Sequence, residues 1–372
     1  MPETIQTHAN LACHHTFAIA QTCEVLIEAH TQQDIIDVYQ NRAYAALPKL
    51  MLGKGSNMLF TAPYQGVVIV NHLLGKTVQE SDTHWHLHIE AGEDWPSLVK
   101  WCVESGYYGL ENLALIPGCA GSAPIQNIGA YGVELQDVCE YVDVLCLESF
   151  EVRRMHAQEC QFGYRDSIFK RDLYQKVVIV ALGLKLAKAW QPNITYGPLQ
   201  GFARESVTAQ EIFDTVCRVR QEKLPDPRVQ GNAGSFFKNP VVSQSEYERL
   251  SAAFPTLVAY PAGDAASEGA MKLAAGWLID QCGLKGHRIG GAQVHPNQAL
   301  VIVNTGNASA DDVLTLAATV RAKVQSTFGV PLEHEVRFMG PQGETRLETL
   351  LEEGRVTAAK SSIDSAVQGE MR

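Results

Sequence analysis

The chain has 372 residues, enough for two or three domains with cores of their own, and its composition (46% hydrophobic, 19% charged) is that of an ordinary globular enzyme. A formal net charge of −11 argues against a surface that binds nucleic acid or an anionic membrane, because both require a basic face. An anionic small substrate is not excluded, since a few local cations can hold one.

The start of the chain and its cysteines indicate the compartment. Met1–Thr4 shows neither the basic nor the apolar region of a signal peptide, and no apolar run approaches the roughly 20 residues that span a bilayer. The nine cysteines are odd in number and include no C-x-x-C pair. This pattern indicates reduced, structural thiols and no disulfide framework or zinc site. We therefore expect a cytoplasmic protein without a membrane segment.

The N-terminal quarter mixes short strands with one helix. Residues 32–60 predict a helix, a strand and the tight loop Gly53–Asn57, and residues 66–71 predict a buried strand. His84–Ile89 predicts a strand with three histidines on one face. These histidines could be metal ligands, but a solvated face is favoured because no carboxylate or cysteine is set nearby as a further ligand. We therefore predict no metal site.

Three helices have clear boundary signals. The first, at 94–105, repeats apolar residues at helical spacing. The second follows the capping box Thr208–Glu211, and the third runs from Ser309 to Gly329. Buried strands are expected at 177–182 and 299–303, and these elements show no strict βαβ alternation. The fold class is therefore predicted to be α+β, with domain boundaries near residues 75 and 222.

The usual nucleotide-binding motifs are absent. Gly53–Gly55 begins like a dinucleotide fingerprint but is followed by Met58 where the third glycine belongs, and Gly75–Thr77 lacks the first glycine of a P-loop. The small-residue stretch Ile116–Gly132 could turn its backbone N–H groups toward an anion. No Lys, Arg or His lies in that stretch, so amides and hydroxyls would have to hold a phosphate. A tight structural loop explains the same composition equally well.

Four polar segments are candidates for chemistry, although each also has a structural explanation such as an ion pair, a helix end or a turn. No Ser-His-Asp or Cys-His signature and no G-x-S-x-G motif occurs, so hydrolytic acyl chemistry has no support. The segments are Phe162–Ser167, Arg220–Pro227, Gly231–Pro240 and Leu332–Phe338.

Taken in order, these motifs closely resemble the UDP-N-acetylenolpyruvoylglucosamine reductase (MurB) family over roughly residues 15 to 340. The motifs are Gly53–Asn57, Ile116–Gly132, Gly163–Ser167, Gly231–Pro240 and Glu335–Phe338. The resemblance implies two α+β subdomains that form an FAD-binding unit of the vanillyl-alcohol-oxidase type, and a third α+β domain for substrate. The implied ranges are 1–75, 76–222 with a return of 336–340, and 223–335, followed by a polar tail at 341–372 that is partly ordered at most.

The resemblance also implies the chemistry: NADPH reduces non-covalent FAD, and flavin N5 passes hydride to C3 of an enolpyruvyl UDP-sugar. Arg165 and Glu335 would stabilise the enol form, Glu335 only if it donates a hydrogen bond, and Ser235 would protonate C2. The implied FAD contacts are Gly53, Gly55, Ser56, Asn57, Pro117, Gly118, Gly121, Ser122, Ile125, Gln126, Asn127, Gly129 and Arg220. The implied substrate contacts are Tyr131, Tyr164, Tyr196, Lys223, Asn239 and Gln298.

Tyr196 lies on the loop that marks the longer form of the family, and the resemblance implies a monomer. Two alternatives use the same fold: a flavin oxidase with another substrate, and a nucleotide-sugar-binding regulator without activity. A covalent flavin would favour the oxidase, and Cys119 is the only cysteine in the loop that could attach one. The stretch 262–270, rich in Gly and Ala, is expected to be a surface insertion.

Overall fold

The computed structural model describes residues 5–262 and 269–357, and the chain forms two compact units. Unit 1 contains Cys23–Gly55, Gln65–Glu222 and the first nine residues. Unit 2 contains Asn10–Thr22, Ser56–Tyr64 and the chain from Lys223 onward. Both units mix helices with mostly antiparallel strands, which confirms the predicted α+β class.

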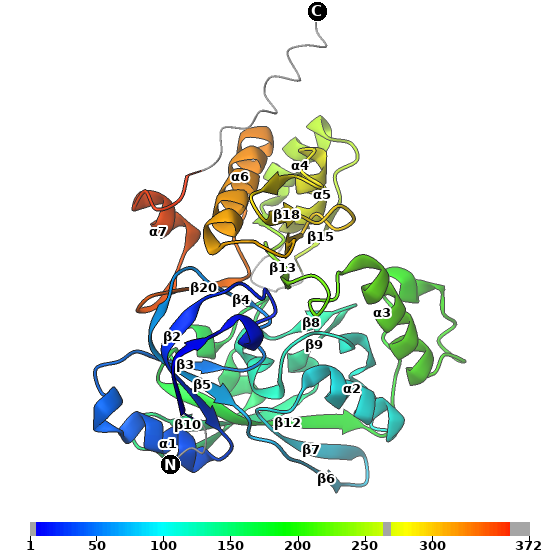
Figure 1. Cartoon of the computed structure of the whole chain (residues 1–372). Helices are drawn as coiled ribbons and strands as arrows, with labels where there is room; N and C mark the ends of the chain where they lie inside the picture. The colour runs from blue at the N-terminus through cyan, green and yellow to red at the C-terminus, as the bar shows by residue number, and fades with distance from the viewer. Residues whose placement is uncertain (1–4, 263–268, 358–372) are drawn as a thin grey trace, which may run out of the picture. The chain divides into compact units, whose positions relative to one another are not determined.

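The larger sheet of unit 1 has five antiparallel strands. The central one is the long strand β12 (Val177–Ala187), shown in green in Figure 1. Val177–Leu182 was predicted as a buried strand, and eight residues of the longer strand are buried. Helix α2 (Trp95–Glu104) buries five side chains, four of them in the adjoining core. The strand order is β11 (Val152–His156), β10 (Cys139–Cys146), β12, β7 (His84–Glu90) and β6 (Lys76–Glu80).

A second sheet of unit 1 packs against helix α1 (Gln32–Gln40), which begins at a capping box between Thr31 and Asp34. Ile35 and Val38 on this helix join the same core as the buried strand residues Val67 and Ile69. The strand order is β1 (Ile5–Asn10), β2 (Thr22–Ala29), β5 (Tyr64–Asn71) and β3 (Lys49–Leu52).

Two further elements complete unit 1. The hairpin of β8 (Gly129–Ala130) and β9 (Val133–Glu134) follows a run of short 3-10 turns. Helix α3 (Ala209–Lys223) follows the Thr208–Glu211 capping box as predicted, with hydrogen bonds of 3.2 Å to the Glu211 amide and 2.8 Å to its carboxylate.

Unit 2 is built on the long helix α6 (Ala310–Phe328), which Ser309 caps and Gly329 ends in the left-handed conformation (φ 76°). Ten of its residues are buried, and nine of them share one core with the strands and with Phe236, Phe237 and Phe338. The principal sheet is β13 (Asn232–Ser235), β19 (Val301–Asn304), β18 (Ala292–Val294) and β17 (Arg288–Ile289).

Two three-stranded sheets and three more helices surround this core. Helix α4 (Gln244–Ala253), helix α5 (Ala275–Gln281) and the sheet β14 (Val241–Val242), β16 (Met271–Leu273), β15 (Ala259–Pro261) follow β13 in the chain. The other sheet is β21 (Gly343–Thr345), β20 (Arg337–Gly340) and β4 (Met58–Phe60), and α7 (Leu347–Glu352) ends the described chain.

The C-terminal segments match the sequence only in part. In the motif Glu335–Phe338, strand β20 begins at Arg337 and pairs in parallel with β4. Within the polar tail, β21 and α7 are formed, and α7 buries Leu347 and Leu350 in the core of unit 2. Residues 358–372 of this tail, and 263–268 of the expected insertion, lie outside the described residues.

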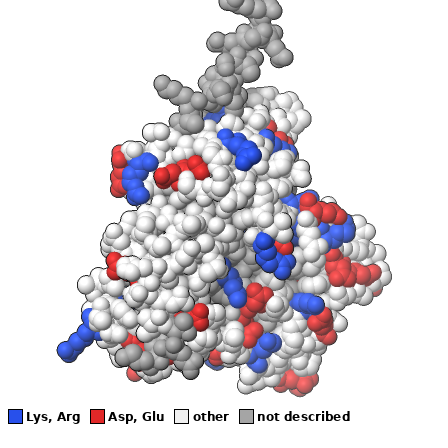
Figure 2. Space-filling view, in the orientation of Figure 1, with Lys and Arg blue, Asp and Glu red and all other residues white. Residues whose placement is uncertain are grey.

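On the face shown in Figure 2, blue and red side chains are interspersed over an uncharged background. Among the residues with described positions, no helix is both long and apolar enough to cross a membrane.

Candidate functional site

The predicted site residues divide between the two units. Unit 1 contains Arg165, Arg220, the tyrosines 131, 164 and 196, the small-residue loop 116–132, and Gly53 and Gly55. Unit 2 contains Ser56, Asn57, Lys223, Ser235, Asn239, Gln298 and Glu335.

In unit 1 the loop 116–132 folds as a series of tight turns that only small residues allow. The Gly121 amide donates to the Ala91 carbonyl at 2.8 Å. A Cβ on Gly121 would lie 2.6 Å from the Ala91 Cβ and 3.1 Å from its carbonyl oxygen, so a larger residue cannot approach Ala91 in this way. Gly53 is a neighbour, because a Cβ there would lie 2.5 Å from the buried Sγ of Cys119. The two glycine-rich segments therefore lie side by side.

Three hydrogen bonds join this loop to the segment that carries Arg165. They involve every second residue of the loop. Two of the three donors are side chains of the Arg165 segment, and the third is a side chain of the loop. The bonds run from Ser167 Oγ to Ile125 O (2.6 Å), from Asn127 Nδ2 to Gly163 O (3.1 Å) and from Arg165 Nη2 to Gly129 O (3.0 Å).

Arg165 lies at the tip of a tight turn. Gly163 and Asp166 exchange backbone hydrogen bonds of 3.0 and 3.3 Å, which leaves Tyr164 and Arg165 between them. Arg165 has a φ of 54°, in the left-handed region that favours glycine. Such a conformation costs on the order of 1 kcal/mol in a non-glycine residue. The Lys170 ammonium donates to the Arg165 carbonyl at 3.0 Å and helps to hold the turn.

Arg220, near the end of α3, has a buried Nε with no hydrogen-bond partner among the described residues. Burial lowers the pKa of its guanidinium, and the nearby Tyr131 and Cys217 act in the opposite direction. Burial also raises the pKa of Tyr131, whose ring packs edge-on against Tyr196 at 6.4 Å. A buried donor without an acceptor is costly, so the position fits a bound molecule that supplies an oxygen.

The loop that carries Tyr196 is tied down by residues that the sequence did not reveal. The Asn112 side-chain amide donates to the backbone carbonyls of Tyr131 and Asn193, both at 2.9 Å. At the start of the loop Trp190 Nε1 donates to the buried carboxylate of Glu111 at 2.6 Å. Burial raises the pKa of Glu111, against hydrogen bonds that lower it. The signal in the sequence that could have identified these anchors is the polar pair Glu111 and Asn112, which interrupts an otherwise apolar segment.

In unit 2, Ser235 and Glu335 lie close together. Ser235 ends β13 directly after Gly234, which has a φ of 72°. The Phe236 amide then donates to Leu300 O at 2.7 Å, and the Phe236 carbonyl accepts the Glu335 amide at 2.8 Å. The backbone of the residue next to Ser235 is therefore bonded directly to Glu335.

Asn57 joins the same group. Its side-chain amide donates to the Glu335 carbonyl at 3.3 Å, and its own carbonyl accepts the Arg337 amide at 3.1 Å. The predicted FAD contact Asn57 and the predicted catalytic residues Ser235 and Glu335 thus form one cluster in unit 2.

Two of the residues predicted for the substrate converge on the start of α5. Asn239 Oδ1 accepts the Ala275 amide at 2.9 Å. A Cβ on Gly276 would lie 3.5 Å from the Gln298 Oε1. Lys223 is exposed at the end of α3.

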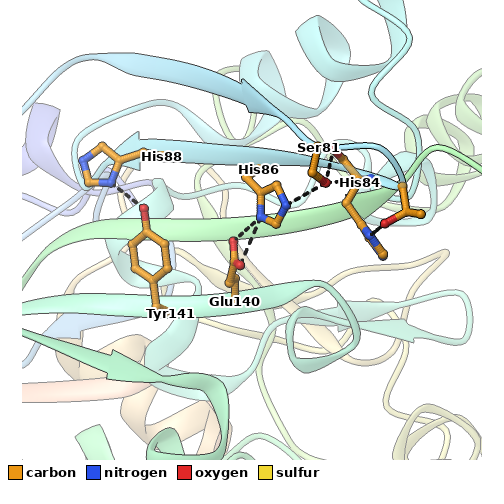
Figure 3. Close-up of polar contacts among 7 residues, drawn as sticks. Ser81, His84, His86, His88, Glu140 and Tyr141 are labelled. Carbon is orange, nitrogen blue, oxygen red and sulfur yellow. Dashed lines mark hydrogen bonds and ion pairs between the residues drawn. The ribbon is translucent and has the colours of Figure 1, made fainter.

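Two of the three histidines of β7, His86 and His88, face polar partners from β10, as Figure 3 shows. His86 Nδ1 lies 2.9 Å from the Glu140 carboxylate, and His88 Nδ1 lies 2.9 Å from the Tyr141 hydroxyl. The assumption that no carboxylate lies near these histidines was therefore wrong, because β10 brings Glu140 across the intervening strand β12. Even so, the described residues contain no group of three His, Cys, Asp or Glu side chains arranged to hold a metal.

Comparisons with known proteins give consistent results. A family model for the C-terminal domain of UDP-N-acetylenolpyruvoylglucosamine reductase matches residues 226–339, and a model for an FAD binding domain matches residues 23–153. The UDP-N-acetylenolpyruvoylglucosamine reductase of Vibrio cholerae is 59% identical and aligns over 94% of this chain and 99% of its own. That of Salmonella typhimurium is 53% identical and aligns over 89% and 95%.

A solved structure is similar in fold as well. The UDP-N-acetylenolpyruvylglucosamine reductase (MurB) from Thermus caldophilus superposes with a TM-score of 0.60, over 90% of this chain and 98% of its own, at 24% sequence identity.

Proposed function

The chain belongs to the UDP-N-acetylenolpyruvoylglucosamine reductase family, and we propose how its residues carry out the reaction of that family. The protein is an FAD-containing oxidoreductase of peptidoglycan precursor synthesis. The reaction reduces the enolpyruvyl group of UDP-N-acetylglucosamine enolpyruvate to the lactyl ether, with NADPH as reductant. The observation that carries the mechanism is the cluster of Ser235, Glu335 and Asn57 in unit 2.

The residues of unit 1 fit an FAD. The loop 116–132 lacks basic side chains but holds its backbone in tight turns beside Gly53, and Arg220 has a buried donor without a partner among the described residues. Backbone amides of this loop and Gly55 would hold the pyrophosphate, with Arg220 along the cofactor. Bound FAD would supply, from NADPH, the hydride that the enolpyruvyl group receives at C3.

The chain's own contribution is electrostatic and acidic. Hydride addition at C3 puts negative charge on C2 and on the adjacent carboxylate of the substrate. Arg165, with its guanidinium near the loop at Gly129, would stabilise this charge. Glu335 would assist as a neutral hydrogen-bond donor, because an ionised carboxylate would repel the developing anion. The Ser235 hydroxyl would then protonate C2; it is a weak acid, but the carbanion is a much stronger base.

The UDP portion would bind the remaining polar residues of the predicted set. Asn239 and Gln298, which both lie near the start of α5, would contact the diphosphate together with Lys223. Tyr196 would close over the nucleotide on its anchored loop, next to Tyr131. The remaining predicted contact is Tyr164, beside Arg165.

We also propose that the protein is cytoplasmic and monomeric and that residues 1–75 and 76–222 act as two subdomains of the FAD-binding unit. All nine cysteines are free, as expected in a reducing compartment. NADPH and UDP-sugars are cytoplasmic metabolites, which agrees with that location.

Steady-state oxidation of NADPH by the purified yellow protein tests this function. We expect NADPH consumption to depend on the enolpyruvyl UDP-sugar, with one equivalent of UDP-N-acetylmuramate formed per NADPH and detected by mass spectrometry. NADPH consumption that depends on oxygen and ignores the UDP-sugar would indicate a flavin oxidase and contradict the proposal.

A further inference from the structure

Asn127 has no exposed surface, and its side-chain groups are all engaged inside unit 1. Its two N–H groups face the Glu134 carboxylate at 2.8 Å and the Gly163 carbonyl at 3.1 Å, while its Oδ1 accepts the Gln136 amide at 3.0 Å. Gln136 donates in turn to the same Glu134 oxygen at 2.8 Å. The Asn127 side chain therefore links three backbone segments and has no donor left for a cofactor.

We infer that Asn127 is a positioning residue for the reduction of the substrate, which fixes the turn that carries Arg165 instead of contacting the cofactor. This inference rests on the proposed function, since it assumes that Arg165 acts on the substrate. Asn127 itself has a φ of 44°, a second left-handed residue on the path between the loop and the turn. Asparagine adopts this conformation more readily than most residues, so the backbone of Asn127 suits the end of the 3-10 turn at Pro124–Gln126.

The bond from Asn127 to Gly163 O is the central of the three that join the loop to the Arg165 segment. On one side of it Arg165 Nη2 donates to Gly129 O, and on the other Ser167 Oγ donates to Ile125 O. Gly163 opens the two-residue turn, so a shift of its carbonyl moves Arg165 directly. Arg165 therefore depends on Asn127 for its place although the two side chains act on different groups.

The close packing around Gly129 makes the position of the Arg165 guanidinium sensitive to small movements. Gly129 pairs with Glu134 across the hairpin of β8 and β9. A Cβ at Gly129 would lie 2.9 Å from Glu134 Cγ and 3.3 Å from Arg165 Nη1. The Glu134 side chain, which Asn127 orients, and the Arg165 guanidinium thus flank the same point. Loss of the Asn127 bonds would release both groups together.

The test is an isosteric substitution, Asn127→Asp, which replaces the amide nitrogen and both of its N–H donors by one oxygen that faces the Glu134 carboxylate and the Gly163 carbonyl. We expect a protein with the FAD content of the wild type and an unchanged rate of flavin reduction by NADPH. Reoxidation of the reduced flavin by the enolpyruvyl UDP-sugar should be about 10- to 100-fold slower, because misplacement by about 1 Å can cost 10²-fold. Rapid-mixing absorbance measures both half-reactions, and the absorbance ratio of flavin to protein gives the FAD content.

Asn127→Ser is a milder variant that keeps one donor and is expected to give a smaller change of the same kind if Asn127→Asp does not fold. Asn71→Ala, which removes another mostly buried asparagine of unit 1, is the control. This variant should lower the thermal midpoint of unfolding and leave the rates of both half-reactions at their wild-type values.

The outcomes separate the inference from the proposed function. If wild-type reduced flavin is not reoxidised by the UDP-sugar, the proposed function fails. If the wild type turns over but Asn127→Asp loses FAD, slows both half-reactions equally or slows neither, the positioning role of Asn127 is overturned.

Discussion

The side-chain amide of Asn57 donates a hydrogen bond of 3.3 Å to the backbone carbonyl of Glu335, joining residues 278 positions apart in the chain. Asn57 lies in the segment predicted to contact FAD, and Glu335 belongs to the predicted catalytic set. The bond uses only the backbone of Glu335, so a substitution of the side chain at 335 leaves it in place. Chemistry at Glu335 can therefore be tested without loss of this link.

Replacement of Ser235 by alanine should remove the proton donor to C2 and leave the backbone path of β13 intact. The reoxidation of reduced flavin by the UDP-sugar should slow by at least about 10²- to 10³-fold, the usual cost of a lost preorganised donor. Flavin reduction by NADPH should not change. Ser245→Ala, on the exposed side of α4, is the control and should match the wild type in both steps. A Ser235→Ala protein with normal reoxidation would contradict the assignment.

Glu335→Gln and Glu335→Ala separate hydrogen-bond donation from charge. If Glu335 acts as a neutral donor, the glutamine amide can replace it, and Glu335→Gln should retain most of the kcat that Glu335→Ala loses. Equal losses in the two variants would mean that a proton or a negative charge at this position is required. Steady-state kcat with the UDP-sugar gives the comparison.

Gly121→Ala should weaken FAD binding. The added Cβ would lie within 3.1 Å of two atoms of Ala91, so the loop 116–132 must move away from this residue. Gly201→Ala, where a Cβ would meet nothing within 4 Å, is the matched control. The ratio of flavin to protein after purification should fall in the first variant only. Full FAD content in Gly121→Ala would show that this contact does not shape the cofactor site.

Asp312 should stabilise unit 2 in a pH-dependent manner. Burial raises the pKa of Asp312, but hydrogen bonds from the Ser309 and Gly291 amides outweigh it and lower the pKa below the ordinary 3.8. A lowered folded-state pKa contributes stability that is present above pH 3.8 and is lost as the pH falls through the lowered value. Asp312→Asn should therefore reduce the thermal midpoint at pH 7, by the equivalent of about 1 kcal/mol for a helix cap, and lose this difference near pH 2. The neighbouring Asp311→Asn is the control; a deficit for Asp312→Asn that is as large at pH 2 as at pH 7 would refute the idea.

Local signals in the sequence were sufficient for most elements. The capping signals at residues 208 and 309 and the apolar spacing of 94–105 act within one or two turns of chain, and the structure forms each of these helices. The β-branched runs at 66–71 and 177–182 are likewise strands. Family resemblance then supplied the candidate residues, which no periodicity could have identified.

Contacts between distant segments could not be predicted in this way. Glu140 on β10 lies close to His86 on β7 because both strands pair with β12. The sequence does not reveal this strand order. Asn112 and Glu111, which anchor the Tyr196 loop, belong to no recognisable sequence motif. Asn127 was predicted to contact FAD because it lies in the loop 116–132, and nothing in the sequence indicated its bonds inside unit 1. Helix α7 was likewise not predicted, because the chain after residue 340 is mostly polar and the helix buries only Leu347 and Leu350.

The central claim is that one flavin accepts hydride from NADPH and delivers it to an enolpyruvyl UDP-sugar. Anaerobic titration with one equivalent of NADPH, followed by one equivalent of UDP-N-acetylglucosamine enolpyruvate, tests it directly by flavin absorbance. Bleaching by NADPH and full recovery on addition of the sugar are predicted. A flavin that bleaches and then stays reduced would contradict the account.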